Sequence, residues 1–169
     1  MSLVLILFLT KFVLEYWEYI LVYAFFGATI YYAYRRSFKQ ARNTKYQCLI
    51  QDFRLIDKMT GIEFENCLEY IFQRKGYHVD TTPVSNDYGA DLILKKNGII
   101  TVVQAKRYKD KVGVKAVQEV YAAIPYYKAS NAMVVTNSYF TTQAKNLAYT
   151  NHIQLIDRDK LTQLIRDIK

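Results

Sequence analysis

Two short apolar runs, residues 90–95 and 99–106, are joined by the dipeptide Asn97-Gly98. An Asn-Gly pair between such runs is the strongest short-range signal for a two-residue β-hairpin turn, because both turn positions need a positive φ. The pattern therefore predicts two antiparallel strands whose pairing is fixed by the turn. No other feature of the chain constrains its fold as strongly.

The tight turn also sets the register of the two strands. If Lys96 pairs with Ile99, then Asp91 lies opposite Gln104, and both side chains project from one face of the sheet. Lys106 returns to that face because side chains alternate with a period of two along a strand. A carboxylate, an amide oxygen and an ammonium group then converge, and oxygen ligands of this kind can hold Mg²⁺. The alternative is a sheet rim with solvated polar ends.

Several short motifs follow one another between about residue 60 and residue 164. They are, in order, Gly61-Ile62-Glu63-Phe64-Glu65, Gly76-Tyr77, Asp87-Tyr88-Gly89-Ala90-Asp91-Leu92, Gln104-Ala105-Lys106-Arg107-Tyr108, Val117-Gln118-Glu119-Val120, Val134-Val135-Thr136-Asn137, Phe140-Thr141 with Ala144, and Leu155-Ile156-Asp157 with Leu161. Together, in this order and spacing, they resemble the Mrr-type restriction endonucleases of the PD-(D/E)xK nuclease superfamily. The resemblance implies a nuclease that hydrolyses phosphodiester bonds in DNA as part of a restriction system.

The same resemblance implies roles for individual residues. Asp91 matches the family's metal-binding aspartate, and Lys106 matches its catalytic lysine. Most of the superfamily carries a second acid at the position of Gln104, whereas a glutamine there is typical of Mrr proteins. Glu65 is therefore expected to supply the missing carboxylate. The implied metal ligands are Asp91, Glu65, Gln104 and the Ala105 carbonyl, and the implied cofactor is Mg²⁺, for which Mn²⁺ can substitute.

Helical periodicity by itself does not select Glu65. An apolar stripe is predicted on one helix, and both Glu63 and Glu65 flank it. The choice of Glu65 therefore rests on the resemblance, and an ordinary amphipathic helix flank is the alternative. Gln118 matches a recurring family glutamine or is simply an exposed helix residue. Asp87, which opens the motif that contains Asp91, is a further candidate.

A basic cluster follows the proposed catalytic lysine. It consists of Arg107, Lys109, Lys111 and Lys115. Such a cluster is expected to contact DNA phosphates and to contribute salt-dependent, sequence-independent affinity. A solvated loop face is the alternative interpretation.

The remaining apolar patterns predict a small α/β domain over residues 59–169. Besides the hairpin, we expect helices at about residues 62–75, 113–123, 141–149 and 158–168, and strands at about residues 77–82, 132–136 and 152–156. The resulting order, αβββαβαβα, predicts a mixed central sheet with helices on both faces. This is also the order that the resemblance implies for a restriction endonuclease-like core.

The first third of the chain has a different character. Between residues 3 and 34 the charged residues are Lys11, Glu15 and Glu18. In the segment that follows, residues 35–45, every charged residue is basic. This pattern is typical of a transmembrane helix with a positive-inside flank. We therefore expect a membrane anchor over residues 1–34.

The anchor is expected to contain one span at about residues 16–34, because a helix that rises about 1.5 Å per residue covers roughly 27 Å in 18 residues. A basic linker with a connecting helix would occupy residues 35–58. The expected location is then the cell membrane, in a single pass, with the C-terminal domain in the cytoplasm. A tight helical hairpin and a buried soluble helix are the alternatives.

The formal net charge of +8 is divided evenly between residues 1–45 and residues 46–169. The leading hypothesis is a membrane-anchored, Mg²⁺-dependent DNA endonuclease, with DNA and the lipid bilayer as partners. A homodimer is expected from the family, since cutting both strands of a duplex commonly needs two sites. One alternative is a membrane-tethered DNA-binding or sensing module with little or no cleavage. The other is a structure-selective nuclease that acts on branched DNA.

Overall fold

The computed structural model describes residues 3–49, 53–82 and 88–168. The chain divides into two compact units, Met1–Lys45 and Tyr46–Lys169. This division falls inside the segment 35–58 that was expected as a linker, and the limits expected for the domains stay predictions.

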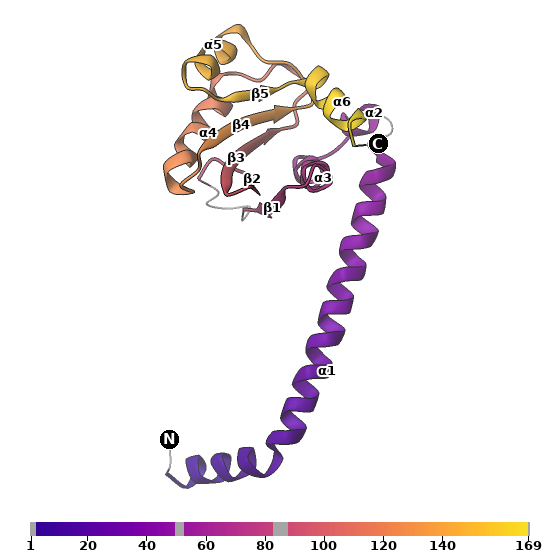
Figure 1. The fold of residues 1–169 in the computed structure, drawn as a ribbon, viewed down its shortest axis with the longest axis vertical. Helices are drawn as coiled ribbons and strands as arrows, with labels where there is room; N and C mark the ends of the chain where they lie inside the picture. The colour runs from indigo at the N-terminus through magenta and orange to yellow at the C-terminus, as the bar shows by residue number, and fades with distance from the viewer. Residues whose placement is uncertain (1–2, 50–52, 83–87, 169) are drawn as a thin grey trace. The chain divides into compact units, whose positions relative to one another are not determined.

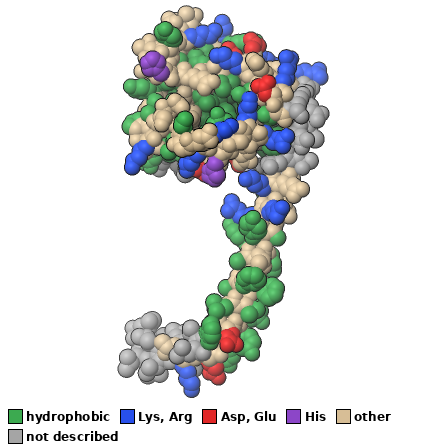
Figure 2. All heavy atoms as spheres, viewed as in Figure 1, with side chains coloured by type: hydrophobic (Ala, Val, Ile, Leu, Met, Phe, Trp, Pro, Cys, Tyr) green, Lys and Arg blue, Asp and Glu red, His purple; other side chains and the backbone are tan. Residues whose placement is uncertain are grey.

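Helix α1 (Leu3–Leu49) supplies the first unit. Hydrophobic side chains are exposed along it, as Figure 2 shows, and the helix continues without a break through the basic segment. The expected membrane span is not supported, since no helix in the described ranges is both long and apolar enough to cross a bilayer.

The second unit is a mixed α/β domain (Figure 1). Its elements are α2 (Phe53–Ile56), α3 (Gly61–Arg74), β1 (His78–Thr81), β2 (Leu92–Lys96), β3 (Ile99–Lys106), α4 (Val114–Tyr126), β4 (Asn131–Thr136), α5 (Thr142–Thr150), β5 (Gln154–Ile156) and α6 (Arg158–Arg166). From α3 onwards the order αβββαβαβα is the one that the sequence predicts. That part of the fold prediction is confirmed.

The five strands form one sheet in the order β1-β2-β3-β4-β5. β1, β2 and β3 pair antiparallel, whereas β3, β4 and β5 pair parallel. At the hairpin turn, Asn97 has φ 52° and Gly98 has φ 76°, and Lys96 pairs with Ile99. The predicted turn and register are therefore confirmed.

Helices cover both faces of the sheet (Figure 1). α3 and α6 pack on one face and α4 and α5 on the other, so each face has its own apolar core. In β3 the side chains of Val103 and Ala105 enter the core under α3, whereas Val102 enters the core under α4. Because side chains alternate along a strand, Gln104 and Lys106 also belong to the α4 face.

An ion pair joins three parts of the domain that are distant in sequence. The Arg158 guanidinium donates from Nη1 and Nη2 to the two carboxylate oxygens of Asp57, at 2.8 Å each. The Asn137 amide donates to Asp57 Oδ1 at 2.9 Å, and Arg158 Nη1 donates to the Asn137 carbonyl at 2.9 Å. These contacts hold the segment before α3 against the end of β4 and the start of α6. The hydrogen bond from Arg158 outweighs the effect of burial and holds the pKa of Asp57 below its usual value.

We expect Asp57→Asn to lower the free energy of unfolding by about 1–2 kcal/mol at pH 7. Because the pKa of Asp57 is depressed in the folded state, its carboxylate stabilises the fold fully above the unfolded-state pKa of about 3.9. This stabilisation is lost as the pH falls through the folded-state pKa. Urea unfolding of both proteins at pH 7 and at about pH 3 measures this. Asp80→Asn, which removes a more exposed ion pair with Lys95, is the control and should cost less. A loss that is equally large at both pH values would contradict the assignment.

Candidate active site

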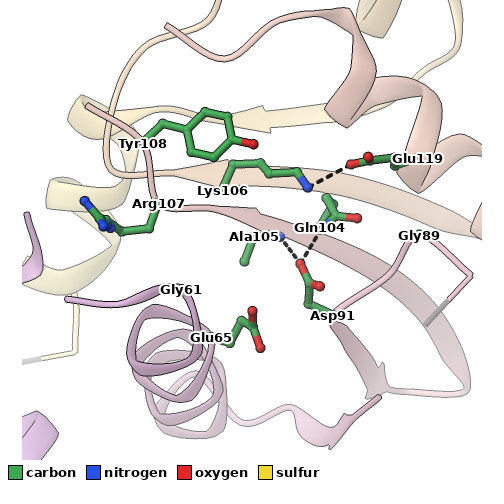
Figure 3. A pocket seen from close by; sticks show the side chains of 10 residues that line it. All are labelled: Gly61, Glu65, Gly89, Asp91, Gln104, Ala105, Lys106, Arg107, Tyr108 and Glu119. Atoms are coloured by element: carbon green, nitrogen blue, oxygen red, sulfur yellow. Dashed lines mark hydrogen bonds and ion pairs between the residues drawn. The ribbon is translucent and has the colours of Figure 1, made fainter. Parts of the chain in front are cut away.

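A cavity of about 340 Å³ lies where α3, the loop before β2, the end of β3 and α4 meet (Figure 3). Its lining consists of Gly61, Glu65, Gly89, Asp91, Gln104, Ala105, Lys106, Arg107, Tyr108 and Glu119. All four residues for which a catalytic role is predicted, and Ala105 with them, therefore line one cavity. Their roles in catalysis stay predictions.

The Asp91 carboxylate is held from β3. Its Oδ2 atom accepts a hydrogen bond of 2.7 Å from the Ala105 backbone N–H and another from the Gln104 side-chain amide. The Asp91 N–H in turn donates to the Val103 carbonyl at 2.8 Å, which extends the pairing of β2 and β3 by one residue. The predicted juxtaposition of Asp91 and Gln104 is confirmed, and the carboxylate has a defined orientation.

The two glutamates that periodicity could not separate have different surroundings. Glu63 belongs to the N-terminal cap of α3, because its carboxylate accepts from the Thr60 N–H at 3.0 Å and its own N–H donates to Thr60 Oγ1 at 3.2 Å. Glu65 lies further along the helix and lines the cavity, and Figure 3 shows its carboxylate pointing toward Asp91. The cap fixes the start of α3 and with it the direction of Glu65.

Lys106 forms an ion pair with a residue for which the sequence predicted no role of its own. Its ammonium nitrogen lies 2.8 Å from Oε2 of Glu119 on α4. Burial alone would lower the pKa of Lys106, but the pair with Glu119 and the nearby Asp91 carboxylate outweigh it, so this pKa lies above its usual value. Lys106 is therefore an ammonium group at neutral pH. One feature of the sequence could have pointed to Glu119, since it is the one acidic residue of α4.

The loop that carries Asp91 is in backbone contact with α4. Gly89 has φ +88°, and a Cβ atom built on it would lie 2.2 Å from the carbonyl oxygen of Glu119. The preceding residue, Tyr88, also has a positive φ, of 48°, which is uncommon for a residue with a side chain. Glycine at position 89 thus allows α4 to approach the loop closely.

The residues predicted to bind DNA, and the two further candidates Gln118 and Asp87, have different positions relative to the cavity. Arg107 lines it but points away from Asp91 in Figure 3, while Lys109 and Lys111 are exposed on the loop after β3. Lys115 is 87% exposed and lies 3.9 Å from Oε1 of Glu119. Gln118 is exposed on α4 outside the cavity lining. Asp87 lies outside the described residues.

The residues that line the cavity fit a hard divalent cation. Glu65 and Asp91 offer carboxylates, while Gln104 and Ala105 offer amide and carbonyl oxygens. In the described part of the chain, no three Asp, Glu, His or Cys side chains gather closely enough to hold a metal ion. A cation here would therefore rely on two carboxylates, with neutral oxygens and water completing its shell, as Mg²⁺ commonly does.

Comparison with known proteins identifies related sequences. Residues 56–165 match the Mrr_cat family model, which describes a restriction endonuclease. The type IV methyl-directed restriction enzyme EcoKMrr of Escherichia coli strain K12 is 35% identical over 85 residues, which are 48% of this chain and 28% of that protein. The chain thus spans less than a third of the length of this curated relative.

Two restriction endonucleases are among the solved structures that this fold resembles. The DNA modification-dependent restriction endonuclease AspBHI is 23% identical with a TM-score of 0.54, over 73% of this chain and 35% of that one. MspJI restriction endonuclease in complex with a 27-mer oligonucleotide is 19% identical with a TM-score of 0.47, over 75% of this chain and 31% of that one. The likeness to AspBHI shows a shared fold.

We expect Gly89→Ala to destabilise the domain by more than about 3 kcal/mol, because it combines an unfavourable positive φ with an overlap of atoms at Glu119. Gly98→Ala is the matched control, since Gly98 has φ +76° but open space around its Cβ position. The control isolates the backbone cost, which is about 1–2 kcal/mol. Chemical denaturation of both variants measures the difference. Equal losses would show that α4 does not press on the loop.

Proposed function

Because the chain belongs to the Mrr_cat family of restriction endonucleases, we propose that it hydrolyses phosphodiester bonds in DNA with the help of a divalent metal ion. One observation carries the proposal: Asp91, Glu65, Gln104 and Lys106 line a single cavity at the end of β3. The match to the family covers residues 56–165, which include all of these residues.

DNA as the substrate is supported by the family and by the charge around the cavity. Arg107, Lys109, Lys111 and Lys115 lie in or near the segment that leads from β3 into α4. These side chains would bind backbone phosphates and add salt-dependent affinity without reading the base sequence. One cavity provides one site, so we also propose that two copies of the chain act together where both strands of a duplex are cut.

Asp91 and Glu65 would hold the metal ion, and Gln104 and the Ala105 carbonyl would add neutral oxygen ligands. When bound, a divalent cation polarises a phosphate group and lowers the pKa of a water molecule. The chain's own contribution is to fix these ligands, since Asp91 is oriented by hydrogen bonds from Ala105 and Gln104. Pre-oriented ligands need little rearrangement before the reaction.

Lys106 would act at the phosphate as a cation and hydrogen-bond donor. Its ammonium group lines the same cavity as Asp91, and its side chain is only 19% exposed. There it would align the attacking water and stabilise the negative charge that develops on phosphorus-bound oxygen. In the reaction, the water gives up a proton to the solvent as its oxygen bonds to phosphorus, and the sugar oxygen whose bond to phosphorus breaks takes up a proton from the solvent.

The full chain should nick supercoiled plasmid DNA in the presence of Mg²⁺ or Mn²⁺. Asp91→Asn and Lys106→Ala should each lower the rate by about 100-fold or more, because each removes a charge that acts on the reacting phosphate. Asp80→Asn, which neutralises a carboxylate on β1 outside the cavity, should cleave like the parent. Gel analysis of methylated and unmethylated plasmid measures the rates, since the E. coli relative is methyl-directed.

Undiminished cleavage by Lys106→Ala would contradict the mechanism. If the parent binds DNA in a salt-dependent way but does not cut any of these substrates, the alternative of a DNA-binding module is favoured instead. Cutting restricted to branched duplexes would favour a structure-selective nuclease.

Glu65→Gln and Glu63→Gln make a matched pair, because each removes one negative charge from the first turns of α3, at positions two residues apart. We expect Glu65→Gln to weaken Mn²⁺ binding by about 10- to 100-fold, as the loss of a carboxylate ligand does. Glu63→Gln should leave Mn²⁺ affinity almost unchanged and lower the unfolding free energy by about 0.5–1 kcal/mol, since only the helix cap is weakened. Mn²⁺ titration followed by electron paramagnetic resonance measures the affinity. The reverse result would assign the ligand role to Glu63.

A further inference from the structure

We propose that Glu119 is a positioning residue whose carboxylate holds the Lys106 ammonium group in place and away from the Asp91 carboxylate. The inference rests on the proposed function, because it gives a partner to the lysine of that site. Glu119 itself is not expected to touch the DNA or the reacting atoms.

The ion pair is short and partly shielded from water. Lys106 Nζ and Glu119 Oε2 are 2.8 Å apart, and the two side chains are 19% and 28% exposed. The pair between Lys95 and Asp80 has the same distance, but those side chains are 50% and 41% exposed. Water and salt screen a buried pair much less than an exposed one. The contact with Glu119 therefore restrains Lys106 more strongly than an ordinary surface contact would.

Glu119 also depends on this lysine. Its Oε2 atom is buried and makes no hydrogen bond among the described residues, so the charge of the Lys106 ammonium group, 2.8 Å away, is what compensates it. The second oxygen lies 3.9 Å from Lys115, whose side chain is almost fully exposed. A carboxylate with one buried oxygen is destabilised when it loses its cation, which favours the paired arrangement.

The backbone of Glu119 is fixed relative to Asp91. The carbonyl oxygen of Glu119 packs so closely on Gly89 that a Cβ atom there would be 2.2 Å away. Val117 and Val120, on the same helix, are completely buried against the sheet. The carboxylate of Glu119 is thus presented by a packed helix that touches the chain two residues before Asp91.

Such a restraint matters because Lys106 has a second acceptor close by. The Asp91 carboxylate also attracts its ammonium group. A lysine side chain has several freely rotating bonds. Without Glu119 it could turn to Asp91 and neutralise the residue proposed to bind the metal. With Glu119 in place, the ammonium group lies 2.8 Å from the Glu119 carboxylate, in the cavity that both residues line (Figure 3).

The first test is Glu119→Gln in the full chain, with plasmid DNA and Mg²⁺. The single-turnover rate at saturating DNA should fall by about 10- to 100-fold, because a small displacement of a reacting group has an effect of this size. The Kd for DNA should change by less than about 3-fold, since phosphate contacts elsewhere provide the affinity. Glu119→Asp, which keeps the charge, should recover part of the rate. Asp80→Asn, which breaks the exposed pair of equal length, should leave rate and affinity unchanged.

The second test does not depend on cleavage. Thermal unfolding of Glu119→Gln, Lys106→Met and the double variant forms a cycle that measures the coupling between the two side chains. We expect Lys106→Met to lower Tm by about 4 °C or more, since it leaves a buried charge without a partner. The double variant should be clearly more stable than the sum of the two single effects predicts.

Cleavage at the parent rate by Glu119→Gln, a loss of DNA affinity in place of rate, or no rescue by Glu119→Asp would each overturn the positioning role. Additive effects in the thermal cycle would overturn the restraint itself. If the parent does not cleave DNA but the cycle shows coupling, the restraint of Lys106 is supported and the proposed nuclease function is the part that fails.

Discussion

The register of the hairpin formed by β2 and β3 is the constraint on which the candidate site depends. A two-residue turn with both φ angles positive at Asn97 and Gly98 allows one pairing, and that pairing brings the Asp91 carboxylate to the N–H of Ala105. A shift by one residue would turn the polar side chains to the opposite face of the sheet. Local backbone chemistry far from the cavity thus decides which atoms face it.

Helices from both faces of the sheet contribute to the cavity at the end of β3. Glu65 comes from α3, whose start is held by the Thr60 cap and by the nearby pair of Asp57 and Arg158. Glu119 comes from α4, whose position is held by its apolar face and by its contact with Gly89. The strand between them carries Lys106. The packing of α3 and α4 on the two faces therefore sets how far Glu65 and Glu119 lie from Lys106, which the strand alone could not do.

The balance of charge in the cavity has a chemical consequence. Asp91, Glu65 and Glu119 are acids, whereas Lys106 and Arg107 are bases. If Lys106 neutralised Asp91, the attraction for a divalent cation would fall, because ligand charge helps to set metal affinity. In the structure the ion pair of Lys106 is made with Glu119, so under the proposed function the negative charges of Asp91 and Glu65 would act on the metal.

The sequence by itself determined the order of elements, the hairpin register and the meeting of Asp91, Gln104 and Lys106, because turn chemistry and the alternation of side chains act over a few residues. It did not separate Glu63 from Glu65, since both flank the same stripe, and only the capping contacts of the folded helix distinguish them. For the apolar segment before residue 35, the distribution of charge predicted a membrane span, although the helix is not apolar enough to cross a bilayer. The contact between Glu119 and Lys106 was decided by tertiary structure alone, because Lys106 lies 13 positions earlier on a strand, and helix periodicity carries no information about which strand residue a helix will meet.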